Sequence, residues 1–325
     1  MPKLTPPVVF AATGSLQLYL VPQSGRYLIE ASGAQGGGNS SVRGGKGARV
    51  RGVFQLKAGD FLNLVVGKQG LPGLDLPVLD EAATELVLKD ASNLIPALSR
   101  GGGGGGGSFV WKNTLTGGRP DWPMLAAGGG GGGGAEPGGD APETSNASPG
   151  KGAGGRHGHG GSSDPEVFYY GGGGGTGWLT PGAHGGGPTF CQGGAQWVGG
   201  LGASFGGYTG GHGGYGGGGG GCFFRAGAGG GGGYSGGGGG GGKTGLSGGG
   251  GGSYNTGLEP YNIAGAQSGD GWIKITCLAP AITIRVPDLA GLEPQPAAQP
   301  ANPLLAAPLD DFRLPRSDRW HFLPR

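Results

Sequence analysis

The chain is poor in charge, in cysteine and in long apolar stretches. Asp, Glu, Lys and Arg make up only 13% of its 325 residues, and the formal net charge is +2. That balance gives no electrostatic case for binding nucleic acid. No apolar run approaches the length needed to cross a bilayer. The first twenty residues also lack the apolar core and cleavage site of a signal peptide, so we expect no membrane partner and no export by the usual route.

The three cysteines are Cys191, Cys222 and Cys277. They are few, widely spaced and odd in number, which is neither the pattern of a disulfide scaffold nor that of a zinc site. We therefore expect buried free thiols.

Motifs of catalysis and cofactor binding are weak. Gly237–Thr244 formally matches a phosphate-binding loop, but that loop needs a strand before it and a helix after it, and here glycines lie on both sides. His157 and His159 have no carboxylate or cysteine at ligand spacing, which favours an exposed loop over a metal site. We expect no enzyme, no cofactor and no metal.

What the chain has in abundance is glycine, at 90 residues, with 25 prolines. Composition alone is typical of disorder, but the ends of the chain look like strands and aromatic residues punctuate the glycines. The runs of five or more glycines are 101–107, 128–134, 171–175, 216–221, 229–233, 236–242 and 248–252. Polyproline II is the natural conformation for such runs. It has no internal hydrogen bonds, so packed runs must bond to their neighbours.

Short stretches rich in β-branched and aromatic residues, separated by turn signals, predict an all-β fold. The expected strands are Val8–Phe10, Leu16–Val21, Arg26–Ala31, Ala48–Leu56, Phe61–Val66, Ser108–Lys112, Pro123–Ala127, Gly271–Cys277 and Ala281–Val286. One short helix is expected within Pro77–Leu88, with Asp80 as its N-cap.

Strand-like sequence thus brackets the glycine-rich region. We expect one glycine-rich β-sandwich domain over residues 1–286, with strands at about 7–127 and 271–286 and a glycine-rich insert at 128–270. Residues 287–325 follow as a proline-rich linker and a docking tail.

Several segments resemble the glycine-rich domain of the anaplastic lymphoma kinase receptor family. They are Tyr19–Gly37, the glycine runs before Ser108–Trp111 and after Met124–Ala127, Tyr215–Gly237 and Asp270–Ile275. The resemblance covers roughly residues 8–277. It implies a sandwich of the tumour-necrosis-factor type, a jelly roll, with an inserted bundle of polyglycine II helices. The receptors' transmembrane, kinase and cysteine-rich parts have no counterpart here, so no ligand-binding residue carries over.

The polyglycine II bundle expected for this chain also resembles the bundles of the distal adhesins of phage long tail fibres, whose loops bind the host. This likeness implies a virion protein, such as a tail-fibre tip, adhesin or decoration protein. Its partners would be a host-surface receptor or polysaccharide and other virion proteins, with a homo-oligomer possible. The alternative is an extracellular, cell-surface or signalling-type ligand-binding module.

Aromatic residues between glycine runs are the candidate binding residues. Either they wedge and cap the bundle, or those on exposed turns contact a carbohydrate or protein receptor, because recognition usually sits on loops of a rigid scaffold. The binding candidates are Phe168, Tyr169, Tyr170, Trp178, Tyr208 and Tyr215. In the tail, the candidate docking residues are Phe312, Leu314, Arg316, Arg319, Trp320 and Phe322.

Overall fold

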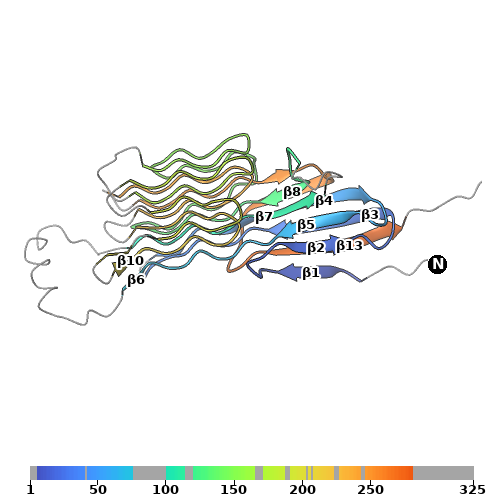
Figure 1. The fold of residues 1–325 in the computed structure, drawn as a ribbon, viewed down its shortest axis with the longest axis horizontal. Helices are drawn as coiled ribbons and strands as arrows, with labels where there is room; N and C mark the ends of the chain where they lie inside the picture. The colour runs from blue at the N-terminus through green and yellow to red at the C-terminus, as the bar shows by residue number, and fades with distance from the viewer. Residues whose placement is uncertain are drawn as a thin grey trace, which may run out of the picture. The chain divides into compact units, whose positions relative to one another are not determined.

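The computed structural model describes ten stretches of the chain, all within one compact unit, Met1–Ile282. These stretches are 6–40, 42–75, 100–113, 120–164, 171–186, 191–202, 204–205, 208–222, 227–242 and 246–280. Within them every regular element is a β-strand (Figure 1).

Two five-stranded antiparallel sheets face each other in the arrangement of a β-sandwich. The first sheet has the order β1 (Val8–Ala11), β13 (Trp272–Pro280), β3 (Gly25–Ser32), β4 (Gly47–Leu56) and β12 (Leu258–Gln267). The second has the order β11 (Tyr254–Asn255), β8 (Leu125–Ala127), β7 (Ser108–Lys112), β5 (Phe61–Val65) and β2 (Gln17–Leu20). A small third sheet joins β6 (Leu74–Asp75), β10 (Tyr208–Thr209) and β9 (Ser204–Phe205).

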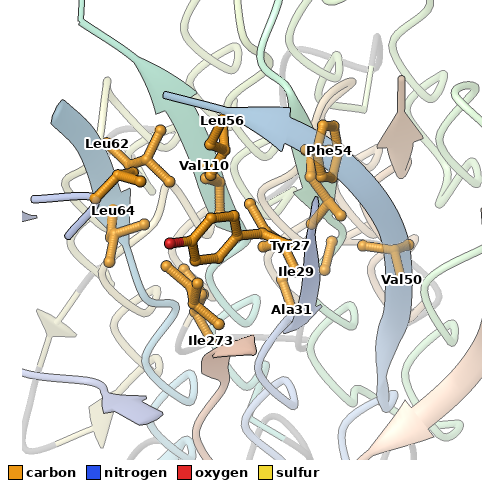
Figure 2. Packing of buried hydrophobic residues seen from close by; sticks show 14 of the residues in the cluster. Tyr27, Ile29, Ala31, Val50, Phe54, Leu56, Leu62, Leu64, Val110 and Ile273 are labelled. Atoms are coloured by element: carbon orange, nitrogen blue, oxygen red, sulfur yellow. The ribbon is translucent and has the colours of Figure 1, made fainter. Parts of the chain in front are cut away.

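Alternation of side chains along the strands builds the core between the two large sheets. Tyr27, Ile29 and Ala31 of β3 point inward and are fully buried, and they meet Leu62 and Leu64 of β5 (Figure 2). Burial, together with the nearby thiol of Cys277, raises the pKa of Tyr27 to about 12. The Tyr27 hydroxyl stays protonated and donates a 2.7 Å hydrogen bond to the carbonyl of Gln23.

The glycine-rich segments lie side by side and are joined by backbone hydrogen bonds, and Figure 1 draws them as wavy traces beyond the strands. We call the following segments together the glycine bundle: 33–40, 42–46, 67–73, 101–107, 128–164, 171–186, 191–202, 210–222, 227–242 and 246–253.

Hydrogen bonds of the run 101–107 repeat every three residues. Every third amide of this run donates to the same neighbouring segment, so successive amides donate to three different neighbours in turn. Gly102 and Gly105 donate to Gly133 and Gly130, and Gly103 and Gly106 donate to Leu71 and Lys68. Gly104 and Gly107 donate to Gly219 and Gly216. The run 128–134 follows the same rule, because Gly129 and Gly132 donate to Gly232 and Gly229, while Gly130 and Gly133 donate to Ala34 and Gly37. Backbone groups that would be orphaned in a buried glycine run are thereby satisfied.

This packing leaves no room for side chains inside the bundle. A Cβ placed on Gly104 would overlap the carbonyl oxygen of Gly230, and one on Gly131 would overlap that of Gly248. The backbones approach so closely that glycine is required at both positions.

The boundaries of the glycine-rich region differ from those expected from the sequence. Segments 33–40, 42–46, 67–73 and 101–107 precede residue 128 and still belong to the bundle. Conversely, β11 and β12 lie inside the range 128–270 and are strands of the two large sheets. The glycine bundle is therefore built from extensions at one end of many strands, rather than from a single insert.

Most of the expected strands are confirmed with ends shifted by one to three residues, and Ser108–Lys112 matches β7. The expected strand at Ala281–Val286, the helix within Pro77–Leu88 and the whole linker and docking tail lie outside the described residues.

Candidate functional site

A second apolar cluster covers the outer face of the second sheet. Phe109 and Trp111 of β7 alternate with the inward Val110, so their rings point away from the sandwich core. Turns of the glycine bundle cover them with Trp178 and Trp197. The ring centroids of Trp111 and Trp197 lie 5.3 Å apart in a stacked pair, and those of Trp111 and Trp178 lie 5.6 Å apart edge to face. The outer face of this sheet is thus buried at β7 and β8, whereas Leu18, Leu20 and Phe61 near its β2 edge stay exposed.

Two tyrosines extend this aromatic cluster. The rings of Tyr234 and Tyr254 stack with centroids 4.3 Å apart, and burial raises the pKa of Tyr234, with Tyr254 adding to the effect. Tyr215 packs against the same cluster, and burial raises its pKa too. Trp178, Trp197 and Tyr234 wedge the bundle onto the sheet, which was one of the two alternatives open from the sequence.

The binding candidates from the sequence fall into three groups. Trp178 is 1% exposed, and its indole nitrogen donates to the carbonyl of Pro120, so the structure places it in the core rather than on an exposed turn. Tyr215 is half-buried, and Tyr208 belongs to strand β10. Phe168, Tyr169 and Tyr170 lie outside the described residues, as do the docking candidates Phe312, Leu314, Arg316, Arg319, Trp320 and Phe322.

Turns of the glycine bundle do expose apolar side chains. Leu179 follows the buried Trp178 and is 42% exposed, while Val198 follows Trp197 and is 58% exposed. Trp197 itself has φ of 63°, in the left-handed region that bulky residues rarely adopt, within a turn closed by hydrogen bonds between Ala195 and Val198. Each turn therefore packs one tryptophan against the aromatic cluster and exposes the next residue.

The expectation of free thiols is wrong for two of the three cysteines. Cys191 and Cys222 form a disulfide inside the bundle, where both are fully buried, and Cys277 is free and buried in the sandwich core. The spacing of 31 residues along the chain gave no sign that the bundle brings these two cysteines together.

Histidines of the bundle accept backbone hydrogen bonds. The Nδ1 atom of His184 accepts from the amide of Gly193, and that of His212 accepts from the amide of Gly202. Among the described residues, no group of three or more His, Cys, Asp or Glu side chains is placed to hold a metal ion.

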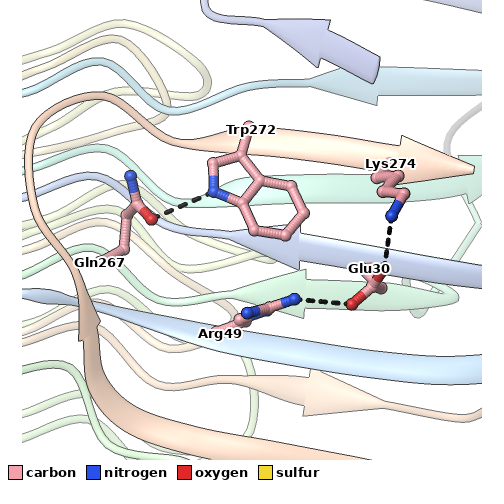
Figure 3. A network of polar contacts seen from close by, with 5 residues as sticks. All are labelled: Glu30, Arg49, Gln267, Trp272 and Lys274. Carbon is pink, nitrogen blue, oxygen red and sulfur yellow. Dashed lines mark hydrogen bonds and ion pairs between the residues drawn. The ribbon is translucent and has the colours of Figure 1, made fainter. Parts of the chain in front are cut away.

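The outer face of the first sheet carries a network of charged and aromatic side chains that was not predicted from the sequence. Glu30 of β3 is 5% exposed, and its two carboxylate oxygens lie 2.8 Å from Arg49 and 3.7 Å from Lys274 (Figure 3). Trp272 donates from its indole nitrogen to Gln267, at 3.1 Å. The alternation Arg49-Val50-Arg51 on β4 was the available signal, since it puts both arginines on one face.

Both arginines of β4 also stack on aromatic rings. The guanidinium carbon of Arg49 lies 5.0 Å from the ring centroid of Trp272, and that of Arg51 lies 4.6 Å from the ring centroid of Tyr261. Such contacts hold a cation in place on a flat ring. The outer face of the first sheet is therefore an ordered surface.

Comparison with known proteins gives no family. No protein-family model matches the chain, and no curated protein matches it. Within the described part of the chain, no helix has the length and apolar character needed to cross a membrane.

Proposed function

We propose that this chain is a structural and binding protein of a virion: a phage tail-fibre tip, adhesin or decoration protein that presents receptor-binding loops on a rigid glycine scaffold. The observation that carries the proposal is the bundle itself. Its runs bond to several neighbours at once and leave no space for side chains, so residues able to recognise a partner are displaced to the turns.

The three-residue repeat of donors supports polyglycine II helices, because a polyproline II helix has three residues per turn. The two five-stranded antiparallel sheets support a jelly roll of the tumour-necrosis-factor type. Such a scaffold suits a particle that must survive outside a cell while its loops vary.

The disulfide between Cys191 and Cys222 supports a place outside the reducing cytosol, since disulfides persist in oxidising surroundings. A virion meets such surroundings after release. The same observation favours the alternative function, an extracellular ligand-binding module of a cell surface. In both, the binding residues we propose are Phe168, Tyr169 and Tyr170, then Tyr208 and Tyr215.

The first test is localisation. Antibodies against the purified protein, detected by immunogold electron microscopy, should label released particles from cells that carry the gene. Label confined to the cell envelope, with bare particles, would refute the virion proposal and favour the cell-surface module.

The second test separates the loops from the scaffold. Replacing Phe168, Tyr169 and Tyr170 together by Ala should abolish binding to host cells while leaving the melting temperature unchanged. Phe61, which is 49% exposed on the sandwich, provides the matched control, and Phe61→Ala should bind normally. Unchanged binding by the triple variant would place recognition elsewhere.

A further inference from the structure

The outer face of the first sheet has two cross-strand rows of side chains. In the first row, Lys274 of β13 lies opposite Glu30 of β3, and Glu30 lies opposite Arg51 of β4, which in turn lies opposite Tyr261 of β12. In the second row, Trp272, Ser32, Arg49 and Ile263 follow one another across the same strands. Directly opposite residues on one face are about 5 Å apart, so the two rows form one continuous surface.

Two of the basic side chains on this face pair with Glu30, and a third, Arg51, does not. Glu30 stands between Lys274 and Arg51 in the register, yet its oxygens are taken by Arg49 and Lys274. The guanidinium of Arg51 turns the other way, over Tyr261, and among the described residues no carboxylate pairs with it. Because Arg51 is exposed, the N–H groups of its guanidinium can donate hydrogen bonds to an anion from solution.

An aromatic ring lies beside this open cation. Tyr261 is 52% exposed, and the ring is held against the guanidinium of Arg51.

We propose that the outer face of the first sheet binds a carboxylate-bearing polysaccharide, with Arg51 pairing the carboxylate and Tyr261 packing against the apolar face of the sugar ring. The proposal rests on the proposed adhesin function and deepens it by naming the class of receptor. It also places recognition on the sandwich, in addition to the loops.

The composition of the face favours a sugar over a macromolecule of another class. Protein interfaces are enriched in Arg and aromatic residues but depleted of Lys and Glu, and the centre of this face is the buried Glu30 paired with Lys274. Tight binding of nucleic acid needs many phosphate contacts, and here two of the cations, Arg49 and Lys274, already pair with Glu30. A flat ring next to one open guanidinium fits a single uronate residue of a chain.

The test is binding of polygalacturonate to the purified full chain, measured by isothermal titration calorimetry with dextran as the neutral polymer. Arg51→Ala and Tyr261→Ala should each weaken binding about tenfold or more, as expected for a charge-assisted bidentate contact and for the ring that orients it. Arg156→Ala is the matched control, because it removes the same charge from an exposed turn of the bundle and should bind as the wild type does.

Four outcomes would overturn the proposal. They are no binding of polygalacturonate, equal weakening by Arg51→Ala and Arg156→Ala, equal binding of dextran, and Arg51-dependent binding of single-stranded DNA or polyglutamate as tight as that of polygalacturonate. Thermal melts of each variant show that the fold is retained. Labelled particles without polygalacturonate binding would refute this inference alone and leave the virion function standing.

Discussion

At the scale of single residues, Asp60 illustrates how position in the fold sets protonation. Burial by itself would raise the pKa of Asp60, but the hydrogen bond and charge of Lys112, 2.7 Å away, and the amide of Lys57 outweigh burial and lower that pKa. The carboxylate closes the turn before β5 and ties it to the end of β7.

Because the pKa of Asp60 is lowered on folding, its contribution to stability is fully present above the unfolded value of about 3.9 and is lost as the pH falls through the folded value. Asp60→Asn should lower the free energy of unfolding at pH 7 by about 1 kcal/mol or less, since Lys112 is half exposed. It should also flatten the loss of stability below pH 4. Urea denaturation between pH 2 and pH 7 measures both effects.

Asp121 supplies the control, because it is an exposed carboxylate with no ion pair within the described residues. Asp121→Asn should follow the wild-type pH profile. If Asp60→Asn and Asp121→Asn gave the same profile of stability against pH, the ion pair between Asp60 and Lys112 would contribute nothing to stability.

At the scale of elements, the glycine runs depend on contact between backbones. Gly104→Ala should lower the free energy of unfolding by about 2–4 kcal/mol, because the methyl group overlaps the carbonyl of Gly230 and pushes the run away from its hydrogen-bond partners. Urea denaturation followed by tryptophan fluorescence measures this loss.

A glycine outside the bundle separates this effect from backbone strain. Gly59 has φ of 86° and open space around its α-carbon, so Gly59→Ala should cost only about 1–2 kcal/mol through its conformation. Equal stability of Gly104→Ala and the wild type would mean that the run is not packed as described.

The elements differ in how far the sequence predicted them. The alternation of Tyr27, Leu28 and Ile29 marks a half-buried strand, and β3 is there. Strand β12 was missed because Pro260 and Gly265 interrupt its pattern and two register shifts bend it. The burial of Trp178 could not be predicted, since a ring between glycines looks the same in sequence whether a sheet lies beneath it or not.

At the scale of the whole molecule, the disulfide links segments that are distant along the chain. Cys191 and Cys222 are 31 positions apart along the chain, for which the loop-entropy model gives about 3–4 kcal/mol of stabilisation. Reduction of the wild-type protein should lower its melting temperature. A Cys191→Ser, Cys222→Ser double variant should melt at that lower temperature with or without reductant.

Two results would contradict this role. If the melting temperature of the wild-type protein were the same with and without reductant, the disulfide would add no stability. A double variant whose melting temperature still changes with reductant would mean that the change does not come from this disulfide, because the remaining cysteine, Cys277, is a free thiol.

The repeat of three in the donors of the run 101–107 also limits how such a chain can change length. Adding or losing three glycines returns every later amide to its old neighbour, whereas adding one glycine gives each later amide the wrong neighbour. In the gene this unit corresponds to nine nucleotides of repetitive glycine codons. Replication slippage in steps of three codons would therefore lengthen or shorten one run while its other amides keep their hydrogen-bond partners, and it would move the turn at the end of that run outward or inward.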